Sequence, residues 1–190
     1  MTVNPDHQAL ADYLTDILGG SAAIEAYWDK PRRSSIDIVT AIDQPDQGLT
    51  TCSTLGLSDY PIGLISDGLQ VRAELMLTLR SADKDIQGML ATCSMDVIND
   101  KFPIRPGSIL PKVVELYRPD LAMKDMFVVD PFTWNLEART LPTKKVAWLA
   151  VVPISEAERN HARTNGSEAL DALLEARGVE IFNLERPSSL

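Results

Sequence analysis

Residues 71–79 show the clearest alternation of apolar and polar positions in the chain. A period of two predicts a strand with one face in a core. Residues 50–55 are rich in β-branched and small polar side chains, so they are predicted to form the neighbouring strand. Gly56 is predicted to end it, because glycine adopts positive φ without steric strain. Residues 57–68 are then predicted to be a long surface connection, a kind of loop that is often functional.

Other segments repeat their apolar positions at helical spacing. Helices are predicted at residues 5–18, 22–28, 83–102, 155–165 and 167–178. Asn4 and Asp83 are predicted to cap the first and third of these helices. Ser155 and Glu158 have the spacing of a capping box, in which each side chain satisfies the free backbone amide of the other residue.

The remaining apolar runs predict strands. They are residues 36–42, 112–117, 125–130, 146–152 and 180–184. Short connections favour an antiparallel meander of 36–42, 50–55 and 71–79. Residues 146–152 are almost all apolar, as in a central strand that is buried on both faces. The predicted fold class is α/β of the α+β type: a mixed, largely antiparallel sheet with helices packed on it.

The length of 190 residues fits a single domain over residues 1–190, and the apolar share of 45% is ordinary for a globular protein. The longest apolar run is far shorter than the roughly 20 residues of a membrane helix. No basic residue precedes Lys30, so no secretory signal is expected. Cys52 and Cys93 do not suggest a disulfide framework. We therefore expect a soluble, cytoplasmic protein.

The formal net charge of −9 narrows the range of partners. Phosphate backbones and anionic membrane surfaces would repel such a chain, so neither nucleic acid nor membrane is an expected partner. The charge is explained either by solubility or by a preference for a basic partner protein.

No residue pattern predicts catalysis, a metal or a cofactor. Residues 56–60 partly resemble a nucleophile elbow, but Tyr60 stands where that turn requires a second glycine. The only histidines, His7 and His161, have no zinc-like spacing to each other or to the cysteines. Ser58 and Asp59 are instead expected to hold the loop through local hydrogen bonds.

Some residues are candidates for binding a partner. Glu74 lies on the face opposite the apolar positions of its strand, where it forms either a solvated cross-strand pair or part of a binding surface. Phe132 and Trp134 belong either to the core or to an interface. Arg186 could pair with an acid such as Asp59 or Glu74. The candidate partner-binding residues are Leu57, Ser58, Asp59, Tyr60, Glu74, Trp134 and Arg186.

Several short motifs together resemble the Suppressor of fused family. The motifs are Thr54-Leu55-Gly56-Leu57-Ser58-Asp59, Glu74-Leu75, Phe102-Pro103-Ile104 with Pro106-Gly107, Val146–Ile154 with the acidic residues after it, Asn165-Gly166, and Glu185-Arg186-Pro187-Ser188. Each motif is weakly specific, and their order and spacing carry the resemblance. It covers about residues 23–188.

The resemblance implies a protein that binds another protein. The animal family member is a two-domain regulator that holds zinc-finger transcription factors, and this chain resembles only its first domain. Stand-alone versions resemble bacterial proteins proposed as immunity factors against toxins. An acidic surface would suit a basic toxin, for instance a nuclease. We therefore expect a non-catalytic immunity protein that neutralises a toxin by binding and occlusion. The alternatives are a regulatory adaptor that binds a cellular partner, or a hydrolase that uses Ser58, Asp59 or Glu74.

Overall fold

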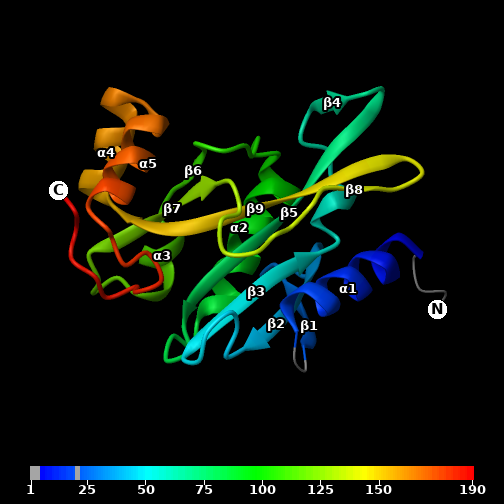
Figure 1. Ribbon diagram of the computed structural model, residues 1–190, viewed down its shortest axis with the longest axis horizontal. Coiled ribbons are helices and arrows are strands. Elements are labelled where there is room, and N and C mark those ends of the chain that lie inside the picture. The colour runs from blue at the N-terminus through cyan, green and yellow to red at the C-terminus, as the bar shows by residue number, and fades with distance from the viewer. Residues whose placement is uncertain (1–4, 20–21) are drawn as a thin grey trace.

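A twisted sheet runs through the middle of the molecule (Figure 1). The computed structural model describes residues 5–19 and 22–190, and within these residues the sheet has nine strands in the order β1-β2-β3-β5-β9-β7-β6, with β4 on β5 and β8 on β9. The strands are β1 (Ala23–Trp28), β2 (Ser35–Ile42), β3 (Leu49–Leu55), β4 (Leu64–Ser66), β5 (Leu69–Arg80), β6 (Ile109–Leu110), β7 (Met123–Val129), β8 (Arg139–Thr140) and β9 (Lys144–Ser155).

The strand pairing is antiparallel except at the centre. β2, β3 and β5 form the predicted antiparallel meander. β5 and β9 run parallel, with Glu74 opposite Trp148, and β9 then pairs antiparallel with β7. Because β9 lies between two strands and is covered on both faces, its apolar run is continuous, as the sequence predicted.

Helices cover both faces of the sheet and so make three layers. They are α1 (Pro5–Leu18), α2 (Ile86–Asp100), α3 (Val113–Tyr117), α4 (Glu156–Asn165) and α5 (Ser167–Ala176), with a short 3₁₀ helix η1 (Leu57–Asp59) after β3. The predicted α1, α2, α4 and α5 are therefore confirmed. Asn4, the predicted cap of α1, lies outside the described residues. Asp85 rather than Asp83 precedes α2, and it makes no side-chain capping bond.

α2 and α3 cover one face of the sheet. Met89, Leu90 and Cys93 of α2 are buried in one cluster with Leu75 and Leu77 of β5. These residues of β5 are two apart, so they point to the same side of the sheet, whereas the even-numbered residues point to the other. Cys93 is a buried free thiol, as predicted, and so is Cys52.

The opposite face carries α1 at one end and the α4–α5 pair at the other (Figure 1). Leu10 and Leu14 of α1 pack with Met76 and Trp148. Leu170 and Leu174 of α5, with Ala162 of α4, form a separate cluster with β7 and β9. This face of the sheet therefore carries two separate hydrophobic clusters, one at each end of β9.

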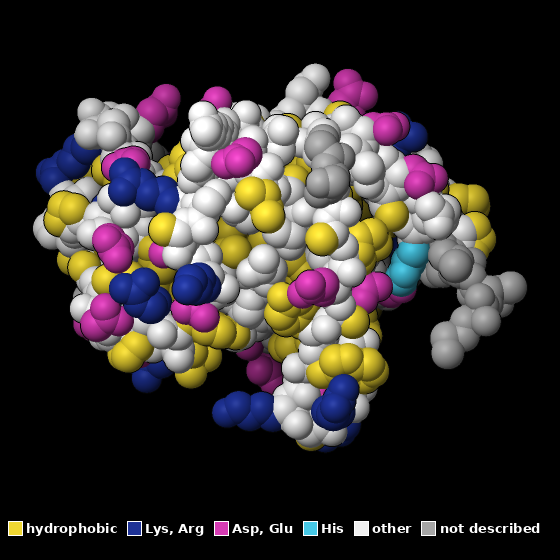
Figure 2. Space-filling model, turned by 90° about the horizontal axis from the view of Figure 1, so that it is seen from below, with side chains coloured by type: hydrophobic (Ala, Val, Ile, Leu, Met, Phe, Trp, Pro, Cys, Tyr) yellow, Lys and Arg dark blue, Asp and Glu magenta, His cyan; other side chains and the backbone are white. Residues whose placement is uncertain are grey.

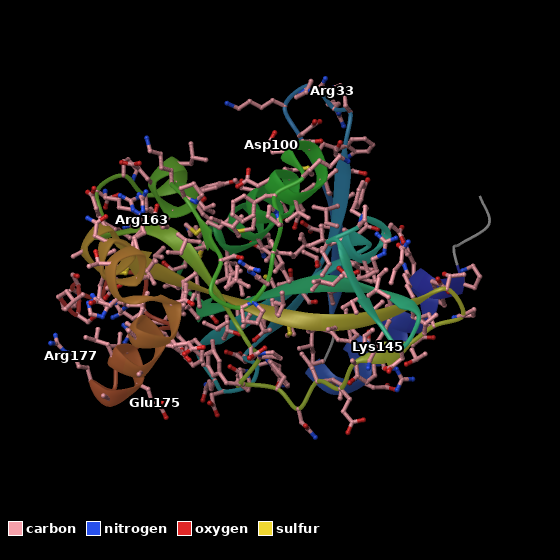
Figure 3. The ribbon with its side chains drawn as sticks, turned by 90° about the horizontal axis from the view of Figure 1, so that it is seen from above. Arg33, Asp100, Lys145, Arg163, Glu175 and Arg177 are labelled. Carbon is pink, nitrogen blue, oxygen red and sulfur yellow. The ribbon has the colours of Figure 1, made fainter. Side chains whose placement is uncertain are left out.

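Residues 23–28 form the strand β1, so the helix predicted over residues 22–28 is wrong. β1 pairs with β2 along its whole length, and this hairpin extends beyond the body, with Arg33 labelled near its tip (Figure 3). Figure 2, from the opposite side, shows basic and apolar side chains on a projecting lobe. Trp28 is half exposed, under the guanidinium of Arg32. The apolar positions of this short segment fit a helix, but backbone hydrogen bonding to β2 makes it a strand.

Three other predictions need correction. Residues 112–117, predicted as a strand, contain the helix α3, which buries Val113 and Val114 side by side. Residues 180–184, also predicted as a strand, form turns. The carbonyl oxygen of Phe182 accepts a hydrogen bond from Arg80 N at the end of β5, and the Glu180 carboxylate pairs with the Arg80 guanidinium. The connection 57–68 is not irregular throughout, because it contains η1 and β4. None of the described helices is long and apolar enough to span a membrane.

Candidate functional site

The centre of the site is the buried carboxylate of Glu74. Its Oε1 accepts hydrogen bonds from the backbone amides of Gly56 and Ser58, both at 3.0 Å. Its Oε2 accepts one from the amide of Leu57 at 3.2 Å and one from the hydroxyl of Thr54. Four donors therefore converge on one carboxylate that has no exposed surface. Burial raises the pKa of Glu74, and the hydrogen bonds from Thr54, Ser58 and Gly56 offset part of that rise.

The chain turns at Gly56 so that consecutive amides face the same way. Gly56 has φ +104°, a conformation that side chains with a Cβ rarely adopt. A Cβ at this position would also lie 3.1 Å from the ring of His7. The turn starts η1, whose first amides would otherwise be unpaired inside the protein. Glu74 therefore closes the loop as a capping group supplied by a neighbouring strand.

A second set of charges lies at the outer end of this loop. Lys144 Nζ is 2.7 Å from Asp59 Oδ1, and His7 Nε2 is 2.7 Å from Asp59 Oδ2. Lys144 also reaches the hydroxyl and carbonyl oxygens of Ser58, each at 3.4 Å. Partial burial raises the pKa of Asp59, but the bonds from Lys144 and His7 outweigh it, so the pKa is lowered overall. These contacts join α1, η1 and β9.

The geometry assigns different surroundings to the seven candidate residues. Leu57, Ser58 and Glu74 are buried, whereas the Asp59 side chain is 41% exposed and Tyr60 is half-buried. Glu74 is thus neither on a solvated face nor in a cross-strand ion pair, because the loop covers it. Contact with a partner stays a prediction. Of these five residues, Asp59 and Tyr60 have side-chain surface that a partner could contact.

Arg186 does not join this loop, so its suggested pairing with Asp59 or Glu74 is wrong. It forms a two-pronged bond with Glu158 at 2.7 and 2.8 Å and also bonds the carbonyl oxygen of Pro153. Glu158 closes the predicted capping box with Ser155 and also accepts the amide and hydroxyl of Ser189. The pair therefore fastens the C-terminal segment to α4.

Burial acts to raise the pKa of Glu158, but the bonds from Arg186 and from the amides of Ser155 and Ser189 outweigh it and lower the pKa to about 2.

A third buried acid, Asp125, was missed by sequence reasoning. It bonds Arg159 at 2.9 Å and the amide of Lys112 at 2.7 Å. Asp125 belongs to no recognisable sequence motif, so no local signal identified it.

The aromatic candidates separate into core and surface. Trp134 is half-buried against the cluster that contains α1, and its indole nitrogen is buried without a partner. Phe132 is 54% exposed and stacks on Phe182. Within the part of the chain that the structure describes, no group of three His, Cys, Asp or Glu side chains is arranged to hold a metal ion. The hydroxyl of Ser58 lies beside Lys144 but has no exposed surface.

The chain matches the family described as Suppressor of fused protein over residues 32–187. It belongs to this family. Solved structures of similar fold include a Suppressor of fused homologue from Neisseria gonorrhoeae, with 13% identity, coverage of 97% of this chain and 96% of that chain, and a TM-score of 0.72. Drosophila Suppressor of fused aligns with 13% identity and a TM-score of 0.58, over 88% of this chain and 42% of that chain.

A further fold neighbour is the Sufu–Fu complex, with 13% identity, a TM-score of 0.60, and coverage of 97% of this chain and 89% of that chain. Among curated proteins, the chain is similar to Immunity protein YqcF of Bacillus subtilis strain 168. The two are 37% identical over 190 residues, which is 99% of each chain. The predicted family and fold class are thereby confirmed.

Replacement of Glu74 by glutamine should destabilise the protein by about 2–6 kcal/mol. Glutamine keeps the size of the side chain but replaces one acceptor oxygen by a donor, so two of the four converging donors lose their partner, at about 1–3 kcal/mol each. Urea unfolding measures the change. The matched control, Glu137→Gln in an exposed loop, should stay within about 0.5 kcal/mol of wild type. Equal stability of the two variants would show that Glu74 does not hold the loop.

Stability should depend on pH through Glu158. Its folded pKa of about 2 lies below its ordinary value of 4.5, so its charged form favours the folded state. This contribution is complete above pH 4.5 and is lost as the pH falls toward 2. Urea unfolding of wild type and Glu158→Gln across this range should therefore show their difference shrinking with acid. A difference that is constant with pH would contradict the assignment.

Arg186→Met leaves the buried carboxylate of Glu158 unpaired. It should lower the free energy of unfolding by about 3–5 kcal/mol at neutral pH.

Proposed function

We propose that the protein is an immunity protein, which acts in the cytoplasm by binding a toxin and covering its active surface. The observation that carries this proposal is the 37% identity to an immunity protein across 99% of both chains. Similarity of that extent includes every layer of the fold, and not a shared motif alone. The partner is a protein, and its inactivation needs no chemistry from this chain.

The buried acids support a mechanism by occlusion. Glu74, Asp125 and Glu158 have no exposed surface, and each bonds backbone amides of a segment outside its own element. Bonds of this kind fix loops before any partner arrives. A preformed surface loses less conformational entropy on binding than a flexible one, which favours tight association.

The net charge of −9 supports a basic toxin as the partner. Complementary charge accelerates encounter and disfavours other acidic proteins. Asp59 belongs to the loop of residues 56–59 that Glu74 holds, which we call the pinned loop, and its side chain is 41% exposed. Leu64 and Ile65 of the projecting strand β4 are 48% and 75% exposed (Figure 1). Asp59 and Tyr60, with these apolar side chains, are the part of the candidate set that we propose to contact the toxin.

Co-expression with the toxin encoded beside its gene tests the proposal. Cells that carry both genes should survive, and the two proteins should co-purify. Because occlusion leaves the toxin chemically intact, toxin separated from the complex in denaturant and refolded should regain its activity and its original mass. Association should also slow as salt is raised, since exposed charges are screened beyond about 10 Å at 0.1 M salt.

Two results would count against this function. Death of the co-expressing cells, with both proteins present, would refute immunity toward that toxin. Recovery of a toxin with altered mass would refute occlusion and point to an enzymatic mechanism. Ser58→Ala is the control for that second case: it should protect as well as wild type, whereas a hydrolase that used this hydroxyl would lose protection.

A further inference from the structure

A groove of about 660 Å³ lies along α5, between this helix and strands β7 and β9. It is on the same face of the sheet as α1 but at the opposite end of β9, so it is separate from the pinned loop at Glu74. Neither its shape nor its lining was anticipated by any sequence motif. The groove is partly open to solvent.

The floor of the groove is apolar. Its side chains come from the end of β7, from β9, from α5 and from the segment after α5. They are Val129, Phe132, Val152, Leu174, Val179 and Ile181. Phe132 is 54% exposed, so much of its ring is accessible to an occupant of the groove. An occupant that brings an apolar side chain into this floor would gain from removing both surfaces from water.

The rim of the groove is acidic. Glu168, Asp171 and Glu175 are spaced by three and four along α5, so they lie on one side of the helix. Asp130 lies across the groove at the end of β7. All four residues are exposed, and none of their carboxylates is bonded to another described side chain.

The lining includes no lysine or arginine among the residues that the structure describes. Arg177, just beyond the end of α5, bonds the carbonyl oxygen of Ser189. In Figure 3 its side chain points away from that of Glu175, so it does not neutralise the rim. Four negative charges thus surround an apolar floor whose described lining holds no lysine or arginine, and cations from a partner would be attracted to them.

We propose that this groove binds a cationic, amphipathic segment of the toxin, in which lysine or arginine side chains flank an apolar side chain. The apolar side chain enters the floor beside Phe132, and the cations pair with the carboxylates of α5 and Asp130. This proposal rests on the proposed immunity function and adds the location and the chemistry of the contact. The rim steers the partner and the floor holds it.

The test compares two triple variants of equal net charge. The rim variant is Glu168→Gln/Asp171→Asn/Glu175→Gln, and the control variant is Asp16→Asn/Asp46→Asn/Glu137→Gln, whose sites are exposed and lie outside the groove. Both remove three negative charges, so long-range attraction changes equally. Each full-length variant is first checked for folding by thermal unfolding.

Binding is measured with two probes: the toxin encoded beside the gene, and a fluorescent 12-residue peptide of alternating lysine and leucine. The rim variant should bind both probes about tenfold more weakly or worse, whereas the control variant should stay within about twofold of wild type. Phe132→Ala should weaken binding of both probes as well, with little change in the dependence of association on salt, because it removes an apolar contact and no charge.

The outcomes separate this proposal from the function on which it rests. If wild type protects cells and the rim variant binds the toxin as tightly as the control, the groove proposal is overturned and the immunity function stands. If wild type fails to protect, the immunity function fails, and the peptide decides: weaker binding by the rim variant alone supports a site for cationic segments, and equal binding overturns it. A wild-type dimer that the rim variant or Phe132→Ala converts to monomer would also overturn the proposal, since the occupant would then be a second copy of this chain.

Discussion

The buried carboxylate of Glu74 is the constraint on which the pinned loop depends. It stands on β5 with its side chain on the face opposite the α2 core, where an apolar residue would be expected. A charge in that position is tolerated only because four donors converge on it. Those donors include three successive backbone amides, which have no other partner in the turn. The acid and the loop therefore stabilise each other.

At two other places in the fold, a buried acid likewise accepts hydrogen bonds from a segment outside its own element. Asp125 of β7 bonds the amide at the start of α3 and the guanidinium of Arg159 on α4. Glu158 of α4 bonds the amide of Ser189 and the guanidinium of Arg186. In each case a buried acid connects segments that hydrophobic packing alone would leave free to slide. The geometry is specific because hydrogen bonds are directional, whereas apolar contacts are not.

Local patterns in the sequence were enough to predict most of the sheet. The alternation of β5, the apolar run of β9 and the capping box at Ser155 each contain their own explanation, and each is confirmed. β1 and α3 were mispredicted because their short segments have weak preferences, and pairing with β2 or packing beneath the sheet decides their structure. Long-range pairing of charges was equally invisible. Arg186 finds Glu158, 28 positions earlier, through the closing of the whole C-terminal segment.

The position of each acid separates structure from recognition. Acids that the fold needs are buried and bonded, so they contribute little field at the surface, and their loss would act through stability. The acids along α5 are exposed and are bonded to no other described side chain, so they contribute little to stability. Their main effect is on the electrostatic field that a partner meets at the groove. The carboxylates along α5, which are bonded to no other described side chain, are therefore available to pair with cations of a partner. A binding protein can exchange such residues to suit a different toxin while Glu74, Asp125 and Glu158 keep the same platform underneath.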